Sequence, residues 1–278
     1  NHGTEKQKRA WLPGMCSGTI IGAIAMTEPS AGSDLANIKT SAKQNKDKFL
    51  INGQKTFISN GHISDLVITA CKTTPDVGAK GISLLVVLRD DEGFSRGRNL
   101  EKIGWHAQDT AELFYSDIEV TVDRMIGEEN KGFTYLMQEL AQERLIVAIR
   151  AATTIEAALE ETIKYTKGRE AFGKPLFSFQ NTRFKLAEAK TNATVVRSFI
   201  DQCTSLHMTQ SLDANDAAMA KLFATETMCK VLDDCLQMYG GYGYMWEYPI
   251  ARMWAGQRIA RIAGGSSEIM KEIISRTL

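Results

Sequence analysis

The sequence predicts an α+β protein in which an antiparallel β-barrel or sandwich is followed by a C-terminal four-helix bundle. Short β-branched or aromatic runs follow one another without intervening helices up to about residue 128, which indicates antiparallel strands rather than a doubly wound sheet. Beyond that point the apolar period changes from two to about 3.6 and stays helical to the end. We therefore predict a short helical segment over residues 1–19, a β domain over 20–128 and a bundle over 129–278.

The charge balance excludes several classes of function. Basic and acidic side chains number 33 each, so no net charge attracts the chain to nucleic acid or to an anionic membrane. No apolar run reaches the length of a membrane span, and the first residues contain no signal-peptide hydrophobic region. These features favour a soluble intracellular protein with neither a membrane span nor a nucleic-acid partner.

The five cysteines are odd in number, widely spaced and mostly set among apolar neighbours, which suits a reducing compartment. We expect core thiols at Cys16, Cys71, Cys203, Cys229 and Cys235. None of the four histidines has a His or Cys at ligand spacing, so the sequence predicts no metal site.

The β domain is read from apolar runs and turn residues. The opening charged segment is predicted to be helical and to stop at Leu12-Pro13-Gly14. A strand is expected over 20–26, followed by a loop over 27–34 whose small and hydroxyl residues permit close approach to a ligand. Further strands are predicted at 48–51, 55–59, 66–70, 82–88 and 112–120, with Asn52-Gly53 as a hairpin turn.

Three apolar stripes and a final short helix predict the bundle. The stripes are Ile149, Ala152, Ile155, Leu159 and Ile163; Val196, Phe199, Cys203 and Leu206; and Leu222, Thr225, Cys229, Leu232, Leu236 and Tyr239. The last helix is expected over 267–276, with Ile269, Met270, Ile273 and Ile274 facing inward.

Five stretches, in order along the chain, together resemble the acyl-CoA dehydrogenase family. They are Met-Thr-Glu-Pro-Ser-Ala-Gly-Ser-Asp at 26–34, Lys-Thr-Phe-Ile-Ser-Asn-Gly at 55–61, Arg-Glu-Ala-Phe-Gly-Lys at 169–174 with Gln180, Gln-Met-Tyr-Gly-Gly-Tyr-Gly at 237–243, and Gly-Gly-Ser-Ser-Glu-Ile at 264–269. Residues 138–145 and 244–249 resemble the long-chain branch most closely. The resemblance implies an N-terminal helical domain, a middle β domain and a C-terminal bundle, so residues 1–19 are expected to end the first domain, most of which this sequence lacks.

The resemblance also implies FAD, held between the last two domains and across a subunit boundary of a homotetramer. The implied cofactor-binding residues are Met26, Thr27, Ser33, Phe57, Ile58, Ser59, Arg169, Phe172, Gln180, Gln237, Gly240, Gly241, Ser266 and Glu268. An arginine pairs bidentately with phosphate, and a double glycine permits close backbone approach. Without the resemblance, the first loop reads as an ordinary turn, Phe57 as core, and the double glycine as a helix cap.

The catalytic base is expected at Glu143. Many family members carry a carboxylate at the position of Gly264, where this sequence has none, whereas the long-chain and isovaleryl branches place it before the arginine that here is Arg144. A Glu beside an Arg on a helix is otherwise a solvated surface pair. The implied substrate-binding residues are Ser33, Arg144, Gly264 and Gly265, with the Gly264 amide polarising a carbonyl at a helix N-terminus.

The implied reaction is FAD-dependent α,β-dehydrogenation of a medium- or long-chain fatty acyl-CoA to trans-2-enoyl-CoA in fatty acid β-oxidation. Electrons would pass to an electron-transferring flavoprotein. The alternatives are an acyl-CoA oxidase, in which oxygen reoxidises the flavin, and a catalytically silent scaffold that binds acyl-CoA. The expected compartment is the cytoplasm in a bacterium or the mitochondrial matrix in a eukaryote.

Overall fold

The computed structural model describes all 278 residues, which divide into two compact units. The first unit comprises Asn1–Lys102 and His106–Gln138, and the second comprises Ile103–Trp105 and Glu139–Leu278. These units are defined by packing, and the domain boundaries predicted at residues 19 and 128 stay a prediction. No helix is both long and apolar enough to cross a bilayer.

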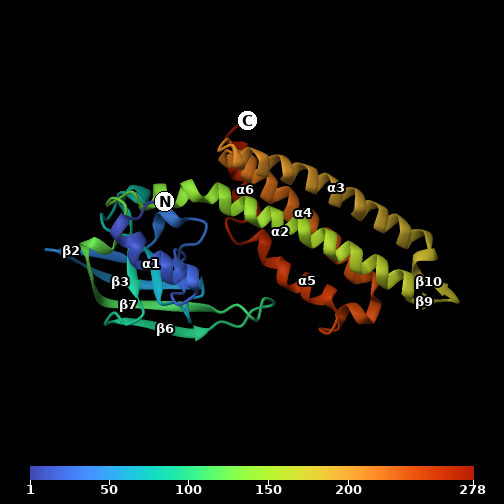
Figure 1. The fold of residues 1–278 in the computed structure, drawn as a ribbon, viewed down its shortest axis with the longest axis horizontal. Helices are drawn as coiled ribbons and strands as arrows, with labels where there is room; N and C mark the ends of the chain where they lie inside the picture. Colours follow the sequence, from blue (N-terminus) through green and yellow to red (C-terminus); the bar gives the residue numbers. More distant parts are fainter. The chain divides into compact units, whose positions relative to one another are not determined.

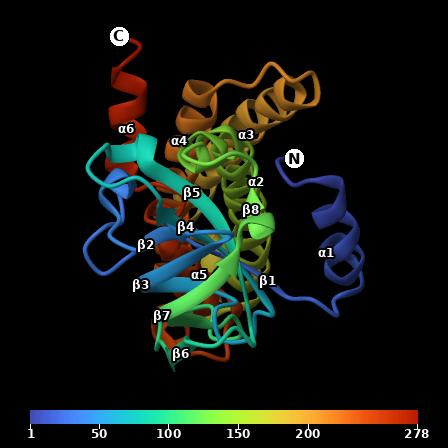
Figure 2. The same ribbon diagram turned by 90° about the vertical axis from the view of Figure 1, so that its left-hand side faces the viewer.

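The first unit is built on a sheet of eight strands (Figure 2). They are β1 (Gly22–Ala25), β2 (Ser41–Asn45), β3 (Lys48–Ser59), β4 (Leu66–Lys72), β5 (Ile82–Leu88), β6 (Phe94–Asn99), β7 (Thr110–Thr121) and β8 (Met125–Ile126). The order is β6-β7-β3-β2-β4-β5-β8, with β1 beside β4. The pairing is antiparallel except where β4 meets β1 and the first residue of β2. β1 is parallel to β4 because the chain reaches β4 through a crossover rather than a hairpin.

The core beside β3 and β7 follows the alternation of these two strands, whereas β4 and β5 are buried on both faces. Phe49 and Ile51 of β3 and Ile118 and Val120 of β7 are buried, and the two strands pair over most of their length. Residues between them point outward, as a sheet with one buried face requires.

The hairpin predicted at Asn52-Gly53 is wrong. β3 runs unbroken from Lys48 to Ser59, and the turn lies instead before it, where Lys46 has a φ of 56° between β2 and β3. Gly53 is required for a different reason: a Cβ there would lie 2.7 Å from the Cα of Thr40. The glycine therefore permits a close approach of two backbones inside the sheet.

The predicted stop of the first helix at residues 12–14 is also wrong, because α1 (Glu5–Ser17) continues through Pro13 to a left-handed Gly18. Its N-terminus is fixed by a capping box of Thr4 and Gln7. The Gln7 amide also donates to the carbonyl oxygens of Asp123 and Met125, each at 2.8 Å. These tertiary contacts stabilise the helix despite its proline.

The second unit contains α2 (Gly132–Gly168, from residue 139), α3 (Gln180–Met208), α4 (Ala214–Met238), α5 (Pro249–Gln257) and α6 (Ser267–Ser275). Figure 1 shows α2, α3 and α4 running side by side as the long members of the bundle. The predicted last helix is α6, whereas the prediction missed α5, so two short helices complete the bundle in place of one. A small hairpin of β9 (Glu170–Ala171) and β10 (Lys174–Pro175) joins α2 to α3.

The predicted stripes lie at the bundle core, but the buried face of α4 is turned slightly from the prediction. Thr225 and Leu232 are buried as expected, whereas Leu222 is only half-buried. Alanines and Met228 occupy the centre of this face instead. Small residues let the helices approach closely, and they carry little weight in an apolar pattern.

Residues Ile103–Trp105 pack within the second unit. A Cβ on Gly104 would lie 2.6 Å from the Cα of Gly256, and the Arg150 guanidinium carbon lies 4.3 Å from the centroid of the Trp105 ring. This contact combines close backbone packing with a cation–π interaction.

All five cysteines are free. Cys71, Cys203 and Cys235 are buried and Cys229 is half-buried, but Cys16 is exposed near the end of α1, so the prediction of a core thiol is wrong there. The structure has no cluster of three or more side chains that could hold a metal ion.

Candidate functional site

The loop over residues 26–34 of the first unit is anchored by a buried ion pair. The Lys55 side chain is fully buried and that of Glu28 is 4% exposed, with Nζ and Oε1 2.9 Å apart. Lys55 also donates to the carbonyl oxygen of Met26 at 2.9 Å. The pair therefore ties the loop to the middle of β3.

The Glu28 carboxylate is further bound by the backbone amides of Lys39 and Thr40, at 2.6 and 2.9 Å. Although burial favours its neutral form, the charge of Lys55 and these hydrogen bonds outweigh burial and lower the pKa of Glu28. Burial lowers the pKa of Lys55, and the Glu28 charge partly offsets this effect. Neither residue was predicted as part of the site, because an ion pair between a loop and a strand leaves no periodic signal in the sequence.

This anchoring brings the loop against the expected aromatic residue of β3. The amide of Thr56 donates to the carbonyl oxygen of Thr27 at 2.9 Å, next to a bulge at Phe57. Phe57 has a φ of 59° and is 67% exposed, so it is not part of the core. A left-handed, exposed aromatic residue in a strand is strained and directs a ring outward.

The other expected residues of this group differ in accessibility. Met26 and Thr27 are half-buried, while Ser33 and Ser59 are exposed. Ile58 is 3% exposed and its side chain lies in the core, so only its backbone is available to a ligand.

In the second unit, one group of expected residues gathers around the end of α2. The Arg169 guanidinium carbon lies 5.4 Å from the centroid of the Tyr242 ring, within the 3₁₀ segment η5 (Gly240–Tyr244). The segment is held there by Tyr239, whose ring stacks on Tyr165 with centroids 3.9 Å apart. Arg169 and Gly240 therefore belong to one surface, and Gln237 is exposed at the end of α4 beside it.

The β9–β10 hairpin presents Phe172 next to Arg169. Phe172 is 96% exposed and has a φ of 52°. Its ring makes an edge contact with Phe179, the residue before the exposed Gln180 at the start of α3, with centroids 6.2 Å apart. Such a side chain adds nothing to the core of its own unit, and its strained backbone favours a binding role.

A second group lies where α2 and α4 meet the loop of Gly264 and Gly265, called here the glycine loop. Glu143 is exposed, but partial desolvation, followed by the charge of Glu139, raises its pKa above the usual range, with Arg144 acting in the opposite direction. Arg144 is 6% exposed, and its Nε has no hydrogen-bond partner. An unpaired, buried guanidinium nitrogen is rare and marks a position for an acceptor.

Lys221 of α4 connects this group to the glycine loop. Its side chain is buried, its ammonium donates to the carbonyl oxygen of Gly265, and its charge is close enough to Arg144 for the two to repel. The structure thus brings Arg144 and Gly265 to the same buried cation. Lys221 was not predicted from the sequence, where its only signal is a charged residue among the alanines of the α4 core face.

The start of α6 is capped by Ser266, whose hydroxyl accepts from the amide of Ile269 at 3.4 Å. Ser267 donates instead to Glu226 of α4 at 2.5 Å, and Arg261 donates to the same oxygen at 2.7 Å. Burial favours neutral Glu226, but these two donors lower its pKa. Glu268 is exposed in the first turn, where its own amide and Ser266 lower its pKa.

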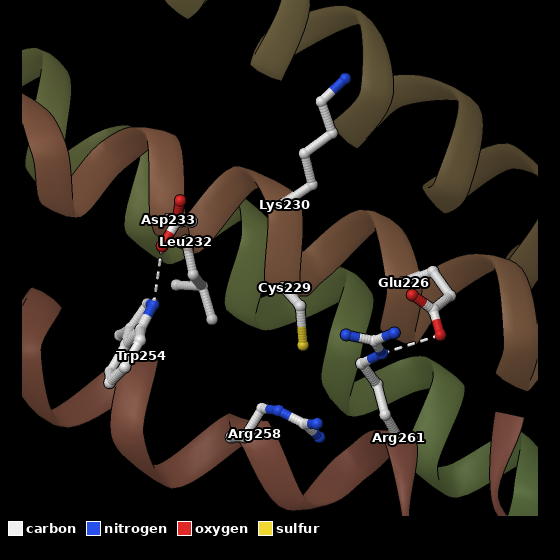
Figure 3. A pocket seen from close by; sticks show the side chains of 8 residues that line it. All are labelled: Glu226, Cys229, Lys230, Leu232, Asp233, Trp254, Arg258 and Arg261. Atoms are coloured by element: carbon white, nitrogen blue, oxygen red, sulfur yellow. Dashed lines mark hydrogen bonds and ion pairs between the residues drawn. The ribbon is translucent and has the colours of Figure 1, made fainter.

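A surface groove of about 340 Å³ lies beside the ion pair of Glu226 and Arg261 and contains none of the expected site residues. It is lined by Glu226, Cys229, Lys230, Leu232, Asp233, Trp254, Arg258 and Arg261. Figure 3 shows Arg261 bound to Glu226 at one end and the indole of Trp254 bound to Asp233 at the other. Of its charged side chains, Glu226 and Arg261 form an ion pair.

Two family profiles match the chain. The acyl-CoA dehydrogenase middle domain matches residues 23–118, and the acyl-CoA dehydrogenase C-terminal domain matches residues 130–278. The chain belongs to the acyl-CoA dehydrogenase family. The resemblance and the fold class drawn from the sequence are thereby confirmed.

Among acyl-CoA dehydrogenase relatives, the mouse (Mus musculus) mitochondrial long-chain specific acyl-CoA dehydrogenase is 49% identical over the whole chain. The chain spans 65% of that protein's length. An acyl-CoA dehydrogenase of Bacillus subtilis is 38% identical over 99% of the chain, which covers 73% of the relative. The crystal structure of an acyl-CoA dehydrogenase from Geobacillus kaustophilus is 50% identical, with a TM-score of 0.98 over the whole chain and 73% of that structure.

Proposed function

We propose that the full-length protein is an FAD-dependent acyl-CoA dehydrogenase that converts a fatty acyl-CoA to the trans-2-enoyl-CoA. The observation that carries the proposal is the group around the glycine loop. There Glu143, a carboxylate with a raised pKa, adjoins the buried Arg144. The buried Lys221 lies near Arg144 and donates to Gly265, in a loop whose amides are free at the N-terminus of α6. A base, a buried positive charge and unpaired amide donors are what proton abstraction next to a carbonyl requires.

The residues present fit FAD in each unit separately. In the second unit Arg169 is an exposed guanidinium that suits a phosphate, and nothing lies within 4 Å of where a Cβ would stand on Gly240 or Gly241. In the first unit the exposed ring of Phe57 suits stacking on an isoalloxazine, beside the hydroxyl of Thr27. Phe172, Gln180 and Gln237 extend the phosphate-binding surface.

FAD, when bound, supplies an acceptor for the hydride that leaves the β carbon of the acyl chain. Glu143 takes the proton from the α carbon and must be ionised to do so. Amides of the glycine loop donate to the thioester carbonyl oxygen, where negative charge develops as that proton leaves. A pKa raised by desolvation makes Glu143 a stronger base than an ordinary carboxylate.

We further propose a medium- or long-chain acyl group, an electron-transferring flavoprotein as electron acceptor and a homotetrameric assembly. The identity to the long-chain specific mouse protein supports the first of these. The exposed side chains of Arg169 and Phe172, which stand away from their own core, support a surface shared with a second copy. The compartment follows the source: the cytoplasm in a bacterium or the mitochondrial matrix in a eukaryote.

The test is Glu143→Gln in the full-length protein, with Glu160→Gln as a control that makes the same charge change on an exposed part of α2. The absorption of oxidised flavin is followed after anaerobic addition of a long-chain acyl-CoA. Wild type and Glu160→Gln should bleach, whereas Glu143→Gln should remain yellow while still binding the ligand. Bleaching of Glu143→Gln at the wild-type rate refutes the assignment of the base.

Two outcomes select the alternatives. A full-length wild-type protein that purifies colourless and does not take up added FAD would be the acyl-CoA-binding scaffold. Rapid, stoichiometric oxygen consumption during turnover would identify an oxidase. Transfer to an electron-transferring flavoprotein without oxygen uptake supports the dehydrogenase.

A further inference from the structure

Lys221 is a buried cation with no carboxylate bound to it. Its side chain is 1% exposed at the core face of α4, and its ammonium donates to the carbonyl oxygen of Gly265. The charged group that acts most strongly on it is another cation, Arg144, whose Nε is itself unpartnered. Two adjacent buried cations are costly to the fold, and apolar residues of the same size would avoid that cost.

The hydrogen bond to Gly265 orients the free amides of the glycine loop. In a trans peptide the carbonyl and the following amide point in opposite directions, so a Gly265 carbonyl held toward α4 turns the amide of Ser266 away from α4. The amides of Gly264, Gly265 and Ser266 take part in no hydrogen bond, and Ser266 begins α6. The φ values of 68° and 97° at Gly264 and Gly265 give the loop a conformation that other residues rarely adopt.

α4 also holds the residues that flank the glycine loop in the sequence. Glu226, five positions after Lys221, binds Ser267 just beyond the loop and Arg261 just before it. α4 therefore holds the loop at three points, and only the Lys221 contact lies within the loop itself. The free amides face a fixed direction because the backbone between these points is short.

We propose that Lys221 is a positioning residue for the dehydrogenation: it aims the amides of the glycine loop at the thioester carbonyl and, together with Arg144, stabilises the negative charge that develops on that oxygen. This inference rests on the proposed function and deepens it. Lys221 acts through its hydrogen bond to Gly265, whereas the unpartnered Nε of Arg144 would find its acceptor in an oxygen that becomes anionic during the reaction.

The surroundings of Lys221 give the proposal a pH signature. Burial, and then the charge of Arg144 from α2, lower the pKa of Lys221 to about 8. The nearby carboxylates act elsewhere: Glu143 adjoins Arg144, Glu226 binds Arg261 and Ser267, and Glu268 faces its own amide. Lys221 is charged below its pKa and neutral above it, so the kcat of wild type should fall as the pH rises through about 8.

The variants are Lys221→Met, which removes both donor and charge, and Lys221→Gln, which keeps a donor without the charge. Lys230→Met is the control, since Lys230 is exposed on the same helix. In flavin-loaded, full-length protein we expect Lys221→Met to lower kcat about 10- to 100-fold with little change in KM, and Lys221→Gln to be intermediate. The alkaline decrease near pH 8 should disappear in Lys221→Met and persist in Lys230→Met.

A readout that does not depend on turnover is the ionisation of bound acetoacetyl-CoA, whose enolate absorbs in the near ultraviolet. In wild type the carbonyl site should favour the enolate, and Lys221→Met should raise the apparent pKa of the bound ligand by about one unit, which corresponds to a tenfold loss of stabilisation. Thermal unfolding of each variant separates this effect from misfolding. A merely structural lysine would change the unfolding midpoint and leave the ligand's ionisation unchanged.

The outcomes separate the two proposals. Wild-type protein that binds flavin but neither bleaches with acyl-CoA nor favours the enolate refutes the proposed function and, with it, the role of Lys221. An active wild type accompanied by a Lys221→Met variant with normal kcat, normal pH dependence and normal enolate formation refutes the role of Lys221 alone.

Discussion

Replacing Lys55 by Met should destabilise the first unit strongly, because it leaves the Glu28 carboxylate buried without its cation. The two charges are 2.9 Å apart in a site that is nearly inaccessible to water. At an effective dielectric constant of about 20, unit charges at that distance attract by about 6 kcal/mol. The amides of Lys39 and Thr40 still bind the carboxylate in the variant, so we expect a net loss of about 3–5 kcal/mol.

The assay must read the first unit separately from the second. Pulsed hydrogen exchange with mass spectrometry, performed across a urea series, does so by following β7 (Thr110–Thr121) for one unit and α4 (Ala214–Met238) for the other. Lys55→Met should move the transition of the β7 peptide to lower urea and leave that of the α4 peptide in place. Lys48→Met is the matched control, because Lys48 lies on β3 like Lys55 but forms an exposed ion pair, with Glu119 of β7. Breaking this exposed pair should change neither transition.

Removing both charges completes the test. The double variant Lys55→Met/Glu28→Gln should recover most of the lost stability, because no ion is then left unpaired. A loss below about 1 kcal/mol in Lys55→Met, or additive losses in the double variant, would refute the ion-pair reasoning. The pKa of Glu28 is lowered in the fold, so its contribution is complete above the unfolded pKa of about 4.3 and is lost as the pH falls through the lower, folded value.

Three further outcomes are expected. Phe172→Asn should keep or raise the free energy of unfolding, by about 1 kcal/mol at most, because asparagine tolerates a φ of 52°, while flavin titration should show weaker binding. Gly104→Ala should cost about 1–3 kcal/mol in urea unfolding, because its Cβ would meet the backbone of Gly256, whereas Gly168→Ala, which meets nothing, should be neutral. The kcat/KM of wild type should fall on acidification through the raised pKa of Glu143, since the base must be ionised; a flat acid limb would contradict this assignment.

Local pattern was enough to predict those strands and helices whose environment matches their sequence. β5 coincides with the predicted run at 82–88, and Ile155 and Leu232 lie in the bundle core as their spacing indicates. The prediction of a turn at Asn52-Gly53 failed because the glycine lies against the backbone of Thr40, which is distant in the sequence. This tertiary contact overrides the local preference for a turn. Likewise, α1 continues through Pro13 because Gln7 makes tertiary hydrogen bonds with Asp123 and Met125.

The candidate site was only partly accessible to sequence reasoning. The family resemblance directed attention to Glu143, Arg144 and Gly264, and their roles stay proposals. The residues that hold the site together were not found: Lys55 with Glu28, and Lys221 beneath the glycine loop. A lysine carries no mark of burial in its own sequence, and whether it is buried depends on helices and loops far along the chain.

The three attachments of the glycine loop to α4 have a consequence for how the protein opens. α6 has nine residues, too few to be stable as an isolated helix, so its formation depends on α4. The hydrogen-bonded amides of α6 and of the middle of α4 should therefore exchange as one cooperative unit, and α6 should not fray separately. Access to the reacting carbonyl would then come from motion elsewhere, while the amide donors remain as rigid as the helix beneath them.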